Sequence, residues 1–168
     1  MTRATLMIGT LIALGGVVGR AAVSAAPSQH GQHGAGQKHG DRAMGFDVKR
    51  TAHHFLLSEN GGSIEVSVKD PADRELRDQV QTHLRHIATQ FGEGNFATPF
   101  AVHKENPAGV PALKQLAAEI AYTFEPSDLG GRVAITTRSQ KALAAVHEFL
   151  RYQIREHKTG DPLTIRRQ

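Results

Sequence analysis

Two stretches decide the fold: GGSIEVSVK at residues 61–69 and GGRVAITT at residues 130–137. In each, a Gly-Gly pair precedes apolar side chains that alternate with more polar ones, which is typical of a strand with one buried face. Strand-like runs lie before both, at residues 51–58 and 120–125, and turn-forming residues separate the members of each pair. We therefore expect two β-hairpins with the same internal pattern.

A helix is expected after each hairpin. The first begins with Asp70 as the N-cap and Pro71 in the first turn, and it ends near Phe91. The second covers residues 140–157 and is capped by Ser139. Apolar residues recur three or four positions apart, which predicts one buried stripe on each helix. These stripes are Leu76, Val80, Leu84, Ile87 and Phe91, and then Leu143, Val146, Leu150 and Ile154.

The two hairpin–helix units also match residue by residue. Val80, Leu84, Arg85, Gly94 and Asn95 recur at the same spacing as Val146, Leu150, Arg151, Gly160 and Asp161. We interpret the regions of about 51–95 and 119–161 as internal repeats. One unit cannot bury its sheet face alone, so the two are expected to share a core. The predicted fold is α+β: two ββα repeats form a four-stranded antiparallel sheet with helices on one face.

The connector between the repeats, residues 95–112, contains three prolines. We expect it to be irregular, with a short strand at Phe100–His103. A short helical turn at residues 113–118 is expected to follow it.

The first 25 residues predict a cleavable signal peptide. Residues 6–19 form an apolar run, and small residues precede the expected cut after Ala25. The run is too short to span a membrane and Arg20 ends it, so we expect no stable membrane anchor after cleavage. Residues 26–45, rich in Gly, Gln and His, predict a flexible tether, and residues 46–168 a single domain. The protein is therefore expected to be periplasmic or secreted.

Charge and composition exclude several classes of function. The chain has 20 Lys and Arg against 16 Asp and Glu, and the predicted cleavage removes two of the basic residues. What remains is nearly neutral and has no aromatic stacking motif, so we expect no nucleic-acid partner. The absence of cysteine excludes disulfides, thiolate metal ligands and a cysteine nucleophile.

Several motifs between residues 44 and 163 resemble an uncharacterised family of exported bacterial proteins. They are MGFD at 44–47, HHF at 53–55, GGSIEV at 61–66, DPAD at 70–73, HLRHIA at 83–88, GVP at 109–111, GGRVAITT at 130–137 and AVHEFLRYQIREHKTGDPL at 145–163. The resemblance implies the same duplicated α+β unit and brings no established activity.

Some members of that family carry an aspartate carbamoyltransferase label, which this sequence does not support. Residues 136–139, Thr-Thr-Arg-Ser, are similar to the Ser-Thr-Arg-Thr phosphate loop of those enzymes. Here the motif ends a predicted strand in a chain too short for those two-domain enzymes. An exported protein would also lack carbamoyl phosphate.

Ten histidines are the candidate metal ligands or acid–base groups. Imidazole commonly binds zinc and copper. The predicted strand and helix faces allow five histidines to meet between the sheet and the helices: His53, His83 and His147, joined by His157 and His103. We therefore hypothesise a zinc or copper site there, although no paired-ligand motif of known spacing is present.

Three of these histidines also have a structural interpretation. His83 would be half-buried and His86 on the surface. His53, whose repeat equivalent is Tyr122, would be a hydrogen-bonded core group. His157 would stabilise the C-terminus of its helix.

Other function classes remain beside metal binding. No nucleophile elbow, P-loop or dinucleotide fingerprint is present, so catalysis is the weaker hypothesis. The alternative is a small-ligand or protein-interaction module with structural core histidines, including a homodimer through the open sheet face or an edge strand. His30, His33 and His39 in the tether would bind metal weakly without defining a function.

Overall fold

The computed structural model describes residues 44–165 of the chain. The predicted signal peptide and nearly all of the predicted tether therefore lie outside the described residues. Within residues 44–165, no helix has the length and apolar character needed to cross a membrane.

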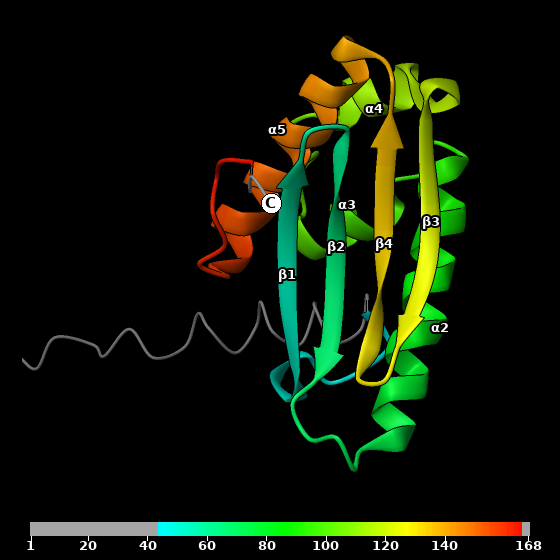
Figure 1. The fold of residues 1–168 in the computed structure, drawn as a ribbon, viewed down its shortest axis with the longest axis vertical. Helices are drawn as coiled ribbons and strands as arrows, with labels where there is room; N and C mark the ends of the chain where they lie inside the picture. Colours follow the sequence, from blue (N-terminus) through cyan, green and yellow to red (C-terminus); the bar gives the residue numbers. More distant parts are fainter. Residues whose placement is uncertain (1–43, 166–168) are drawn as a thin grey trace, which may run out of the picture.

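Four antiparallel strands form one sheet in the order β1-β2-β4-β3, which confirms the predicted α+β architecture (Figure 1). The strands are β1 Thr51–Ser58, β2 Gly61–Val68, β3 Ile120–Ser127 and β4 Gly130–Thr137. The second strands of the two hairpins pair at the centre, where Ile64 lies opposite Val133. The two repeats therefore join through β2 and β4.

Two long helices, α2 (Arg74–Gly92) and α5 (Gln140–His157), lie on the same face of the sheet (Figure 1). α2 packs chiefly on β3 and β4, whereas α5 packs chiefly on β1 and β2. Each helix therefore covers mainly the hairpin of the other repeat, so each repeat depends on the other to bury most of its sheet face. The predicted helix stripes are buried in this core, except that Leu143 is only partly buried.

The start of α2 differs from the prediction. Its N-cap is Asp73, whose carboxylate accepts a hydrogen bond from Leu76 N at 3.3 Å, and not Asp70. Asp70 instead accepts from Ala72 N at 2.9 Å and closes a turn before the helix. Both aspartates accept hydrogen bonds from backbone N–H groups. Because they lie three positions apart and both are good N-cap residues, the sequence alone does not decide which of them begins the helix.

The connector is more helical than predicted. It contains α3 (Ala97–His103), α4 (Val110–Gln115) and the 3-10 helix η2 (Ala117–Glu119). Outside the connector, a second 3-10 helix, η1 (Val48–Arg50), precedes β1. The prediction of a strand at Phe100–His103 is wrong, because these residues belong to helix α3. The Asn95 side chain accepts a hydrogen bond from Ala97 N at 3.0 Å at the start of this helix, and Pro99 is tolerated in its first turn. Figure 1 shows α3 behind the middle of the sheet, between α5 and α2. It thereby covers the gap that the two long helices leave.

Candidate histidine-lined cavity

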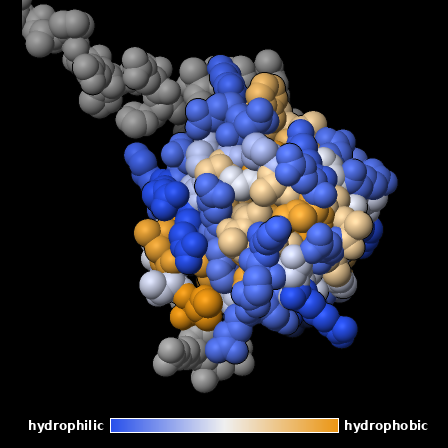
Figure 2. Space-filling view, turned by 90° about the horizontal axis from the view of Figure 1, so that it is seen from above, coloured by the Kyte–Doolittle hydropathy of each residue, from blue (hydrophilic) through white to orange (hydrophobic). Residues whose placement is uncertain are grey.

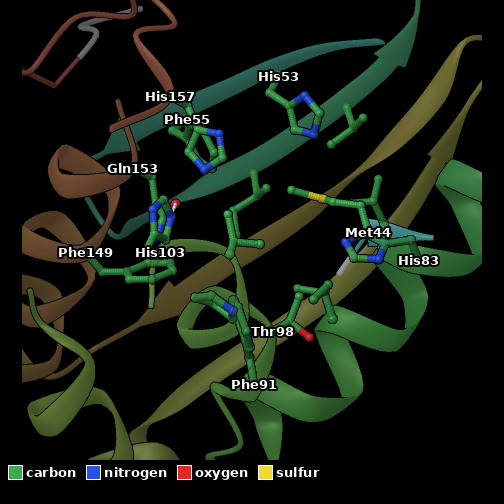
Figure 3. A pocket seen from close by; sticks show the side chains of 16 residues that line it. Met44, His53, Phe55, His83, Phe91, Thr98, His103, Phe149, Gln153 and His157 are labelled. Carbon is green, nitrogen blue, oxygen red and sulfur yellow. Dashed lines mark hydrogen bonds between the residues drawn. The ribbon is translucent and has the colours of Figure 1, made fainter. Parts of the chain in front are cut away.

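A cavity of about 50 Å³ lies in this gap, between α2, α3, α5 and the strands β1 and β2. Four of the five predicted histidines line it: His53, His83, His103 and His157 (Figure 3). The remaining wall is largely apolar and includes Phe55, Phe91 and Phe149. The cavity therefore brings together four of the five histidines of the hypothesis, and metal binding by them stays a prediction.

Separate elements bring the four rings together. His53 lies on the core face of β1, His83 on α2, and His103 and His157 at the last positions of α3 and α5. The His157 ring is central: its centroid lies 6.1 Å from that of His53 and 5.1 Å from that of His103. Phe46 packs between His53 and His83, with centroid distances of 6.3 and 5.4 Å.

Burial keeps three of these imidazoles neutral. Burial is the main cause that lowers the pKa of His53, His83 and His157 from 6.5 to about 4. Repulsion from a neighbouring histidine lowers each pKa further. The neighbour is His83 for His53, His86 for His83, and His103 for His157. At neutral pH each of these rings therefore offers one nitrogen lone pair to a ligand.

Two polar atoms in the cavity wall are buried and have no hydrogen-bond partner in the described part of the chain. They are His53 Nε2 and Gln153 Nε2, although Gln153 Oε1 lies 3.1 Å from His103 Nε2. The Tyr122 hydroxyl has none either, so protein groups do not form the hydrogen bonds expected for His53 and its repeat equivalent. An unmet buried polar atom costs roughly 1–3 kcal/mol, which favours a ligand or water at this cavity.

His147 does not join the other four, which corrects the prediction. Its buried Nε2 lies 2.9 Å from Ser58 O and 3.0 Å from Gly61 O and donates to these carbonyls. His147 precedes His157 by ten residues, which places it about 15 Å away along α5. Through these hydrogen bonds His147 links α5 to the turn between β1 and β2.

Replacing His147 with Leu is expected to lower the free energy of unfolding by about 2 kcal/mol, because two carbonyl oxygens lose their donor. Urea denaturation measures this loss. His86→Gln is the matched control, because His86 is exposed on α2 and its replacement should change stability by less than about 0.5 kcal/mol. Equal stability of the His147→Leu variant and the wild type would contradict the structural role.

The cavity opens towards a wider surface groove of about 600 Å³. The residues that line both the cavity and the groove are Met44, His53, Val102, His103 and His157. We call this shared wall the neck. It lies between the largely apolar cavity and the groove, so imidazoles border both spaces.

The neck donors do not converge on a single point. Within residues 44–165, no group of three or more His, Asp or Glu side chains is placed to hold a metal ion. The rings of His53 and His157 are stacked, with 15° between their planes. Metal binding at the neck therefore requires these rings to turn about their side-chain torsions.

Met44 and Gln153 are cavity residues that the sequence hypothesis missed. Met44 falls within the stretch predicted to be tether, and its signal was the MGFD motif that begins the family resemblance. Gln153 lies one residue before Ile154, a member of the predicted stripe, and its burial was not anticipated.

The open face of the sheet and the edge of β1 bear on the homodimer hypothesis. The open face carries polar side chains together with Leu56 and Ala134, and an ion pair in which Arg132 donates to Glu125 at 2.7 Å. At the edge of β1, Asp161 accepts from Phe55 N at 2.9 Å and lies 2.9 Å from His54 Nδ1. Figure 2 shows a different surface, the end of the domain seen from above, where hydrophilic residues lie between apolar groups. Assembly through either surface stays a prediction.

Fold and cavity together define the class of protein: an α+β domain of two ββα repeats that enclose a histidine-lined cavity. Comparisons with protein-family models, curated proteins and solved structures found no match. The resemblance to exported bacterial proteins, and the carbamoyltransferase label attached to some of them, therefore gain no support here.

Proposed function

We propose that this protein binds one transition-metal ion at the neck of the histidine cavity, outside the cytoplasm. The observation that carries the proposal is the gathering of His53, His103 and His157 at one opening from three separate elements. Two of these rings, His53 and His157, have a pKa lowered to about 4. Metals bind the neutral form of imidazole, so these ligands need no deprotonation at neutral pH.

The ring spacing suits a shared ion. With metal–nitrogen bonds of about 2.0–2.1 Å, two imidazoles on one ion have centroids roughly 4.5–6.5 Å apart. The separations of 6.1 Å for His53–His157 and 5.1 Å for His103–His157 fall within that range. The rings still have to turn before they can share an ion, because those of His53 and His157 lie nearly parallel.

The size of the cavity favours an ion over an organic ligand. A cavity of about 150 Å³ accommodates benzene, whereas a water needs roughly 10–15 Å³. At about 50 Å³, the interior has room for an ion with a water molecule and is too small for a ring-sized ligand. This comparison disfavours an organic ligand inside the cavity itself, and it does not apply to the wider groove.

Metal titration tests the proposal. The protein to use is the full chain with His30, His33 and His39 replaced by Gln, which we call the tether-silent protein because it removes competing tether histidines. We expect one equivalent of copper or zinc to bind in isothermal titration calorimetry. The His157→Ala substitution in this background should weaken binding by at least about 100-fold, more than loss of an outer hydrogen-bond partner does.

The matched control is His86→Gln, because His86 lies on α2 outside the cavity and should leave the affinity unchanged. Circular dichroism checks that each variant is folded. Absence of stoichiometric binding by the tether-silent protein would overturn the proposal. An affinity that His157→Ala leaves unchanged would do the same.

A further inference from the structure

We propose that Met44 supplies a thioether ligand to this ion, and that the site therefore prefers Cu(I) to Zn(II). The inference rests on the proposed function and adds the identity of the metal. It follows from where Met44 lies, from what holds it there, and from the charge of the surrounding wall.

Met44 is part of the neck. It lines both the cavity and the groove, as His53, His103 and His157 do. Figure 3 shows its side chain pointing into the cavity, with the sulfur directed between His53 and His83. One thioether and three imidazoles therefore border the same opening.

The chain next to Met44 is anchored on the same histidines. Phe46, two residues later, is 5% exposed and packs edge-on against His83 and stacks with His53. Gly45 has φ of 76°, a left-handed conformation in which glycine is not strained, and it turns the chain between the two. Met44 is thus held at the neck by a buried neighbour instead of extending into solvent.

The chemistry of the wall favours a soft monovalent ion. Among the described residues that line the cavity there is no Asp or Glu, and the groove adds one carboxylate, Glu156, beside the amines of Lys69 and Lys158. Where no carboxylates offset the cost of desolvation, a divalent ion is less favourable than a monovalent one, because its hydration is stronger. Thioether ligands select Cu(I), and imidazole is compatible with it.

Packing alone is the competing explanation for Met44, since methionine often fills irregular gaps. Leucine separates the two roles, because it keeps most of the volume and removes the sulfur. The other two methionines, Met1 and Met7, lie in the predicted signal peptide, so a sulfur ligand from the domain can be assigned to Met44.

The experiment measures Cu(I) and Zn(II) affinities of the tether-silent protein by competition with chromophoric chelators, under anaerobic conditions for Cu(I). We expect tighter binding of Cu(I) than of Zn(II). Met44→Leu should weaken Cu(I) binding at least about tenfold and weaken Zn(II) binding by a smaller factor, because a thioether is a better ligand for the softer ion. A second readout is the methyl resonance of Met44, which should shift on addition of one equivalent of Ag(I), a redox-inert probe for Cu(I).

The outcomes separate the two proposals. If metal binds and depends on His157, but Met44→Leu leaves the Cu(I) affinity unchanged, the thioether inference is wrong and the histidine site stands. Preference for Zn(II) over Cu(I) also overturns the inference alone. If no metal binds stoichiometrically, both proposals fall.

Discussion

A valine in place of Gly61 or Gly130 is expected to unfold the protein. The two glycines occupy equivalent positions in the repeats, with φ of 152° and 155°, where side chains are strained. A Cβ at Gly61 would overlap the carbonyl oxygen of Ile135, and one at Gly130 would overlap that of Val66. Both clashes fall on the β2–β4 pairing that joins the repeats.

Backbone strain costs about 1–3 kcal/mol and overpacking a further 1–3 kcal/mol, against a total stability of about 5–15 kcal/mol for a typical domain. Circular dichroism and urea denaturation measure the effect. Gly92→Ala is the control, because a Cβ there meets nothing within 4 Å and the stability should not fall. A Gly61→Val protein with the wild-type unfolding midpoint would contradict the central pairing of the repeats.

Acid is expected to destabilise the metal-free protein by at least about 3 kcal/mol between pH 7 and pH 4. His53, His83 and His157 have a pKa of about 4 in the folded protein, against 6.5 for an unperturbed histidine. Unfolded chains therefore take up protons near pH 6.5, before the folded protein does. This stability is fully present above pH 6.5 and is lost as the pH falls towards 4.

One such shift corresponds to about 3 kcal/mol, and the three rings share one cavity, so their contributions do not simply add. Lys69, His54, His86 and His103 contribute further positive charge around them. Urea unfolding at several pH values, with a chelator present, measures the loss. His157→Gln should reduce the dependence on pH, and a free energy of unfolding that is constant from pH 7 to 4 would contradict the buried neutral state.

The fold was predictable because its information is local. Strand alternation at 61–69 and 130–137, and helix stripes ending in Phe91 and Ile154, each specify one buried face. The exchange of helices between repeats was not predictable in this way. It depends on which hairpin a helix packs against, and both hairpins offer a similar apolar face.

The candidate site was predictable in part. Strand register correctly placed His53 on the core face, and helix periodicity placed His83 at the edge of its stripe. Periodicity gives the face of a helix and not the position along it that a partner element reaches, so His147 was grouped with residues that it does not approach. Met44 was missed because only tertiary packing brings it into the cavity.

Copper X-ray absorption spectroscopy of the tether-silent protein, loaded with one equivalent of Cu(I), tests the metal site most directly. We expect imidazole nitrogens at about 2.0 Å and one sulfur at about 2.3 Å, with the copper retained through gel filtration. The His157→Ala variant should lose the copper. A wild-type spectrum without imidazole scattering, or copper that separates from the folded protein, would contradict metal binding at the neck.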